Sequence, residues 1–264
     1  MSLKFCSIAS GSKGNCYLIK TEKTTVLLDV GISGKKIFNA MELALSQPED
    51  VDAVLISHEH TDHSKSVRIV MKKALNATLY STLGTWEKIA ELAPSDRQVV
   101  IESGKSFTVG DIEITPFHVH HDVDEPVGYT FKNSSRQLSI VTDTGHICDN
   151  IFDEIKGADA LVIESNHEPR IVEMCSYPYT IKRRILSDTG HLSNEAAAIC
   201  IGKILQSLPK PRLILLAHLS QENNTPDMAE MTVRNLLFDQ GINIPVDVKI
   251  GVLKQNSQSA VFDV

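Results

Sequence analysis

The sequence predicts an α/β fold in which two β-sheets pack against each other and helices cover the outside. Short apolar runs rich in branched residues alternate with segments of helical periodicity along the 264 residues. The expected strands fall into two groups, and helices accompany each group. A hydrophobic content of 42% is enough for a large core, and no linker-like stretch divides the chain. We therefore expect one domain over residues 1–264.

The first group of elements surrounds a glycine-rich turn. Residues 10–15, Ser-Gly-Ser-Lys-Gly-Asn, connect two strands as a hairpin. They do not match a phosphate-binding P-loop, because Gly14 precedes Asn15 and a strand rather than Lys-Ser/Thr and a helix. The turn can still lie at the rim of a site. Strands are expected at 3–9, 16–19, 25–30, 51–56 and 78–80, with helices at 37–45, 67–74 and 86–93.

The second group begins with residues 98–131, which are expected to be all β, with a hairpin at Gly110-Asp111. Ser193 is placed to cap one helix, and Thr225-Pro226 begins another that Gly241 ends. Residues 167–189 lack clear periodicity and predict a long irregular segment, which in a compact domain is usually functional or disordered. Further strands are expected at 138–142, 160–163, 212–217 and 246–250.

The densest chemistry of the chain directly follows the buried strand at 51–56, in Ser57-His58-Glu59-His60-Thr61-Asp62-His63. Imidazole suits zinc and carboxylate suits manganese or magnesium, so the mixture indicates a transition metal. Side chains of sequence neighbours point in different directions, which favours two ions sharing the loop. The alternative is a polar surface loop that happens to contain three histidines.

Other polar side chains also follow predicted strands, where a rigid scaffold presents chemistry. Asp143 is well placed to bridge two ions, although it is also compatible with a helix cap. Asp29 either orients a ligand imidazole through its other N–H or is a turn carboxylate. Spacing alone does not choose among three nearby histidines. The full set is Asp29, one of His118, His120 and His121, Asp143, Glu164 and His218.

A basic run, Lys182-Arg183-Arg184, is the densest positive stretch in a chain of net charge −7. These side chains either hold phosphates or are simply solvated. His191 follows this run at the entrance of a helix, where it is either a boundary residue or a functional one. The net charge argues against a grip on nucleic acid over the whole surface, but it allows a local basic patch.

Composition also bears on location. The five cysteines include no C-x-x-C pair, which predicts reduced thiols in a cytoplasmic protein. No apolar run reaches membrane-spanning length and no signal peptide is recognisable, so we expect no association with a membrane.

Taken in order, these residues resemble the metallo-β-lactamase superfamily, a four-layer αββα sandwich with mixed sheets. The matching pieces are the opening hairpin, Leu28-Asp29-Val30-Gly31, His58-x-His60-x-Asp62-His63, a histidine at 118–121, Asp143 and His218. The resemblance implies two divalent ions, zinc, manganese or iron. It implies that His58, His60 and one later histidine hold the first ion, that Asp62, His63 and His218 hold the second, and that Asp143 bridges them. The family pattern aligns with Pro116-Phe117, His121-Asp122 and Pro126-Val127-Gly128-Tyr129. By this resemblance, His121 is the later histidine that binds the first ion.

Within the superfamily, three motifs resemble the YycJ/WalJ branch, which is regarded as a DNA exonuclease acting 5′→3′. They are the Ser-Gly-Ser-x-Gly-Asn turn, Glu164-Ser165-Asn166-His167 and Gly190-His191-Leu192-Ser193-Asn194. Related tRNA-processing phosphodiesterases use a histidine oriented by a glutamate, and His191 and Glu164 occupy the matching places. Ser193-Asn194 departs from the threonine of the tRNA enzymes, whose RNA-binding arm is also not recognisable, so DNA is expected as substrate rather than tRNA.

The resemblance therefore implies a metal-dependent phosphodiester hydrolase with Asp62, His191 and Glu164 as catalytic residues. His191 would act as the general acid, and Glu164 would favour its charged form. Lys182, Arg183 and Arg184 would contact backbone phosphates. The alternatives are a hydrolase of a cyclic phosphodiester, lactone or thioester, and a catalytically silent regulatory member of the fold. The sequence does not assign roles to His118, His120, His146 and His167.

Overall fold

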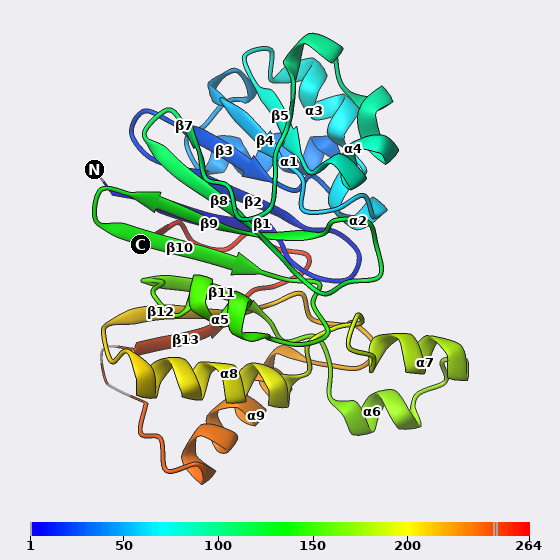
Figure 1. Ribbon diagram of the computed structural model, residues 1–264, viewed down its shortest axis with the longest axis vertical. Helices are drawn as coiled ribbons and strands as arrows, with labels where there is room; N and C mark the ends of the chain where they lie inside the picture. Colours follow the sequence, from blue (N-terminus) through cyan, green and yellow to red (C-terminus); the bar gives the residue numbers. More distant parts are fainter. Residues whose placement is uncertain (1, 245, 247) are drawn as a thin grey trace.

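Two mixed β-sheets stacked face to face form the centre of the computed structural model, which describes residues 2–244, 246 and 248–264. Helices cover the outer face of each sheet, so the molecule has four layers (Figure 1). The predicted αββα sandwich is confirmed.

The first sheet has the order β14-β1-β2-β3-β4-β5-β6. Neighbouring strands are antiparallel from β14 to β3 and parallel from β3 to β6. The strands are β1 (Lys4–Ala9), β2 (Cys16–Lys20), β3 (Thr25–Leu28), β4 (Ala53–Leu55), β5 (Thr78–Ser81), β6 (Gln98–Val100) and β14 (Phe262–Asp263).

The second sheet repeats this plan, with the order β13-β12-β11-β10-β9-β8-β7. Strands β7 to β10 are antiparallel, and β10 to β13 are parallel. The strand predicted at 246–250 is described from Val248 onward, because residue 247 lies outside the described residues. The strands are β7 (Phe107–Val109), β8 (Ile112–His118), β9 (Val127–Asn133), β10 (Arg136–Val141), β11 (Ala160–Glu164), β12 (Arg212–Ala217) and β13 (Val248–Val252).

Two helices begin where the sequence predicts a capping residue. Ser193 accepts a hydrogen bond from the backbone of Ala196, and Thr225 accepts one from Met228. Among the described helices, none is both long and apolar enough to cross a membrane. The first sheet is covered by α1 (Gly34–Leu43), α3 (Val67–Lys73) and α4 (Leu83–Ile89), and the second by α5 (Asp149–Ile155), α8 (Asn194–Ser207) and α9 (Pro226–Asp239). Short 3₁₀ turns are η1 (Pro48–Asp50), η2 (Ala90–Leu92) and η3 (Ser95–Arg97).

The expectation of an irregular segment at 167–189 is wrong, because two short helices lie there. They are α6 (Pro169–Met174) and α7 (Tyr179–Ile185), and they extend from the end of the sandwich away from both termini (Figure 1). Each is at most two turns long, and α7 has no buried residue. A helix without a buried face leaves no apolar periodicity in the sequence.

The core lies between the two sheets and under the helices on both sides. Phe5 and Tyr17 of the first sheet belong to the same buried cluster as Tyr129 and Phe131 of the second. Both faces of the central strands are therefore covered, which explains their continuous apolar runs.

The site residues that follow β3, β10 and β12 have an unusual backbone. Asp29, Asp143 and His218 have φ angles of 57°, 57° and 55°. This left-handed conformation costs a non-glycine residue about 1–2 kcal/mol. Such strain persists where the surrounding structure dictates the conformation, and it concentrates at functional sites. The strand ends therefore direct three polar side chains into a common region.

Replacing Phe131 with alanine should lower the free energy of unfolding by about 3–5 kcal/mol, because Phe131 is fully buried between the sheets. Phe238→Ala is the matched control. Phe238 is 77% exposed, so its replacement should change the free energy by no more than about 0.5 kcal/mol. Urea unfolding of both variants measures the difference. Equal effects would contradict the assignment of the inter-sheet core.

Candidate metal centre

The histidine-rich loop leaves β4 and ends in one helical turn, α2 (Thr61–Ser64). The segment after β3 holds this turn in place, since Val30 N donates to His63 O at 2.8 Å. A side chain at Gly31 would not fit, because a Cβ atom there would lie 1.5 Å from Asp62 O. Glycine at this position thus permits the backbone contact that positions Asp62 and His63.

Three imidazoles converge at one end of the centre. His58 Nε2 lies 3.1 Å from His60 Nδ1, which lies 3.4 Å from His121 Nε2. Burial lowers the pKa of His121, and burial together with the neighbouring imidazoles lowers the pKa of His58. Both rings are therefore held neutral, which is the form that binds a metal ion.

A second group consists of Asp62, His63 and His218, whose ligand atoms lie within 4.8 Å of one another. Asp62 Oδ2 is 3.5 Å from His63 Nε2 and 3.8 Å from His218 Nε2. Asp62 and His63 come from α2, whereas His218 follows β12. Residues from both sheets thus meet in this group.

Asp143 lies between the two groups. Its carboxylate is 3.3 Å from His63 Nε2, 3.5 Å from His218 Nε2 and 3.9 Å from His121 Nε2. Asp143 Oδ2 and His218 Nε2 are buried, and neither atom has a hydrogen-bond partner in the part of the chain that the structure describes. Burying such groups unpaired is costly.

The electrostatics of the centre also favour a cation. Burial alone would lower the pKa values of His63 and His218. Asp143 and other carboxylates outweigh it, raising the pKa of His63 and bringing that of His218 to about 10. Negative charge is thus in excess at the centre. The mixed His/Asp donor set and the unpaired atoms fit divalent metal ions.

Asp29 and Asn15 orient His63. Asp29 Oδ2 accepts a hydrogen bond from His63 Nδ1 at 2.7 Å, and Asp29 also accepts from the backbone and hydroxyl of Ser57. Asn15 Nδ2 lies 3.0 Å from the other ring nitrogen of His63. Sequence reasoning placed only the turn 10–15 near a site. Asn15 could have been identified as a site residue because it is the polar residue that ends this turn.

Glu164 joins two histidines at the end of β11. Its Oε1 accepts hydrogen bonds from Nδ1 of His191 at 2.8 Å and Nδ1 of His218 at 2.9 Å. Its Oε2 accepts from the backbone of Thr144 and Leu192. Burial alone would raise the pKa of Glu164, but the facing imidazoles, His191 foremost, lower it. Because an ionised carboxylate only accepts, each ring donates its Nδ1–H to Glu164, and Nε2 is the ring nitrogen left for another partner.

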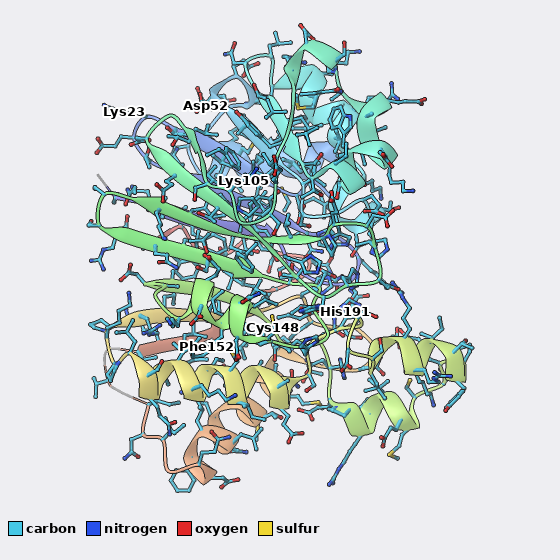
Figure 2. The ribbon with its side chains drawn as sticks, in the orientation of Figure 1. Lys23, Asp52, Lys105, Cys148, Phe152 and His191 are labelled. Atoms are coloured by element: carbon cyan, nitrogen blue, oxygen red, sulfur yellow. The ribbon has the colours of Figure 1, made fainter. Side chains whose placement is uncertain are left out.

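A cavity of about 320 Å³ opens over the centre, lined by Asp62, Asp143, His191 and His218 among others. His191 lies at the end of the sandwich that faces α6 and α7 (Figure 2). Arg184 of α7 also lines the cavity, and its guanidinium pairs with Asp122 and lowers the pKa of that carboxyl to about 2.

The structure does not bring every predicted residue to this cavity. Lys182 turns toward α6, where its Nζ donates to Glu173 O at 2.8 Å, and Arg183 does not line the cavity.

Of the three neighbouring histidines, His121 is the one whose ring lies beside His58 and His60. His118 is exposed, and His120 stacks on His146 with ring centroids 4.1 Å apart. His167 is buried near the centre, and burial lowers its pKa to about 4.

The layers and the histidine–aspartate centre at the strand ends define a class of metallo-β-lactamase-like folds. The solved structure of YhfI from Bacillus subtilis, described as a metallo-β-lactamase fold protein, is similar with a TM-score of 0.74. The two chains are 18% identical, and the match covers 98% of this chain and 99% of YhfI.

Residues 24–218 match the model of the beta-lactamase superfamily domain, and the chain belongs to this superfamily. It is 39% identical to exodeoxyribonuclease YycJ of Bacillus anthracis, with 92% of each chain covered. It is 38% identical to exodeoxyribonuclease WalJ of Streptococcus pneumoniae, over 95% of this chain and 94% of that one. The resemblance to the YycJ/WalJ branch is confirmed.

Metal ions should stabilise the protein through Asp143. At 100 times the dissociation constant, binding adds about 2.7 kcal/mol to the free energy of unfolding, which raises Tm by about 5–10 °C. Asp143→Ala should abolish most of this gain and lower the bound metal, measured by elemental analysis. Asp96→Ala, at an exposed site, is the control. Unchanged metal content in Asp143→Ala would exclude Asp143 as a ligand.

Proposed function

We propose that this protein is a metal-dependent DNA exonuclease that acts in the 5′→3′ direction. The observation that most supports the proposal is the pair formed by His191 and Glu164, which places a proton-carrying ring beside the ligand cluster and at the wall of the cavity. Hydrolysis of a phosphodiester needs such an acid, because the departing alkoxide is a poor leaving group. The names of the YycJ and WalJ relatives agree with DNA as the substrate.

Two divalent ions, zinc, manganese or iron, are proposed for the centre. His58, His60 and His121 would hold one ion, Asp62, His63 and His218 the other, and Asp143 would contact both. When bound, such ions lower the pKa of water and neutralise charge on phosphoryl oxygens.

The residues of the chain supply the remaining steps. Asp62 is 27% exposed at the cavity, where its carboxylate is placed to orient the attacking water. The water gives up one proton to solvent, and its oxygen forms a bond to phosphorus as the bond from phosphorus to the departing oxygen breaks. His191 then donates its Nε2 proton to that oxygen, and Glu164 holds the ring in the required orientation through Nδ1.

The basic residues of α7 are proposed to contact the substrate backbone both inside and outside the cavity. Arg184 lines the cavity and can reach a phosphate beside the scissile bond, while its pairing with Asp122 fixes the guanidinium. Lys182 and Arg183 lie outside the cavity and remain predicted contacts for more distant phosphates.

His191→Ala should reduce kcat on DNA by about 10²–10⁴-fold, as expected for the loss of a general acid, while metal content is unchanged. Bis(p-nitrophenyl) phosphate has a leaving group that does not need a proton, so its hydrolysis should be much less affected. Steady-state kinetics with both substrates measure the contrast.

His118→Ala, at an exposed histidine outside the cavity, is the matched control and should keep wild-type kinetics. Equal losses on DNA and on the chromogenic ester would show that His191 does not act as the acid. Wild-type turnover of DNA by His191→Ala would remove it from the mechanism.

A further inference from the structure

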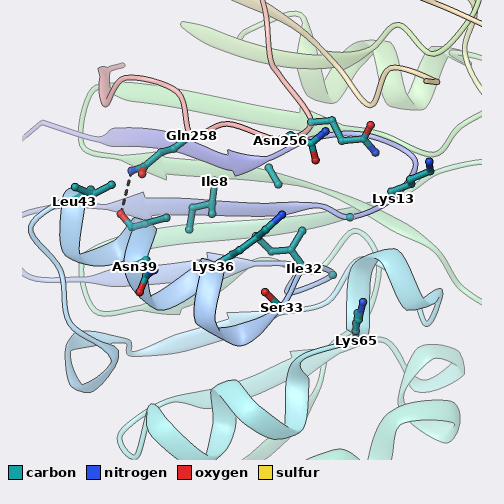
Figure 3. Close-up of a pocket in the computed structure, with 15 residues that line it drawn as sticks. Ile8, Lys13, Ile32, Ser33, Lys36, Asn39, Leu43, Lys65, Asn256 and Gln258 are labelled. Atoms are coloured by element: carbon teal, nitrogen blue, oxygen red, sulfur yellow. Dashed lines mark hydrogen bonds between the residues drawn. The ribbon is translucent and has the colours of Figure 1, made fainter. Parts of the chain in front are cut away.

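A second cavity of about 510 Å³ lies next to the metal centre, which is within the size range of ligand sites. It is formed by the turn between β1 and β2, by α1 along its length, by the end of α2 and by the segment 255–258 (Figure 3). We call it the lysine pocket, after Lys13, Lys36 and Lys65 in its lining. Lys36 reaches into it from α1 (Figure 3).

The lysine pocket and the cavity over the metal centre share a wall. Lys13 lines both cavities. Gly31 lines the lysine pocket and packs directly on the backbone of Asp62, which lines the other cavity. An extended ligand can therefore pass from one cavity to the other over Lys13.

The lysine pocket is positive in an otherwise acidic chain. The protein has a net charge of −7, yet no Asp or Glu is among the lining residues. Lys13, Lys36 and Lys65 form no ion pair within the described chain. The start of α1 adds to the positive potential, since Ser33 makes no capping side-chain bond and the first turn has no acidic residue. These features suit phosphate groups.

The remaining lining suits a nucleoside. Ile8, Ile32 and Leu43 provide apolar surface, while Gln255 provides an amide whose buried oxygen and nitrogen have no hydrogen-bond partner in the described residues. The neighbouring Gln258 is already engaged, since its Nε2 donates to Ala40 O at 3.0 Å (Figure 3). Once the side chain turns into the pocket, this amide can donate to and accept from a base edge.

We infer that the lysine pocket is a second substrate subsite, which binds the phosphates and a base of the DNA strand next to the nucleotide being cleaved. This inference rests on the proposed exonuclease function. It adds a grip on the strand to the contacts proposed for α7, through charge and shape rather than through base sequence.

The test compares Lys36→Gln/Lys65→Gln with wild-type protein. The logarithm of the binding constant falls linearly with the logarithm of the salt concentration, and each lost phosphate contact makes this slope shallower by about 0.7 for a single strand. The double variant should therefore have a slope shallower by about 1.4, and its affinity at physiological salt should be about tenfold lower. Fluorescence anisotropy with a labelled single-stranded oligonucleotide in EDTA measures both quantities. KM for the oligonucleotide should rise similarly, with kcat on bis(p-nitrophenyl) phosphate unchanged.

The charge-matched control is Lys72→Gln/Lys73→Gln, at exposed lysines of α3 that do not line the lysine pocket. If both double variants bind DNA alike, the subsite is refuted while the exonuclease proposal stands. If wild-type protein hydrolyses the chromogenic ester but neither binds nor degrades DNA, the exonuclease proposal fails and the subsite fails with it.

Discussion

The burial of negative charge at one edge of two sheets is the constraint on which the site depends. Asp29, Asp143 and Glu164 are at most 3% exposed, and an unpaired buried carboxylate is strongly destabilising. Asp29 and Glu164 each accept several hydrogen bonds from imidazoles, amides or a hydroxyl. Asp143 Oδ2 accepts none from the described residues. Two of the carboxylates therefore orient rings, and the third is left for a cation.

Glu164 links the candidate metal site to the candidate general acid. The same Oε1 atom accepts hydrogen bonds from the ring of the candidate ligand His218 and from the ring of the candidate acid His191. In the proposed mechanism, the position of the donated proton and the position of a metal ligand therefore both depend on this one atom. Any change that displaces this carboxylate should disturb metal binding and proton transfer together, whereas a change at His191 alone should disturb only the second.

The sequence predicted the two sheets and the polar groups after their strands, because buried parallel strands produce apolar runs that end abruptly. It could not choose among His118, His120 and His121 by spacing, because the turn after β8, and not the strand period, directs His121 inward. It missed α6 and α7, since short helices with little buried surface have no periodic signal. Asn15 was missed because its role depends on a contact with His63, 48 positions away.

The distribution of charge decides from which side a polyanion can approach. Of the basic run on α7, Arg184 is neutralised by Asp122, and Lys182 is turned toward α6. The cavity over the metal centre itself includes Asp62, Asp143 and Glu222, so without bound cations it repels phosphate. Bound divalent ions would reverse the sign at its floor, while Lys13 keeps the rim positive on the side of the lysine pocket. Binding of a phosphate in this cavity and binding of metal should therefore reinforce each other, because cations there compensate the carboxylates that repel the phosphate.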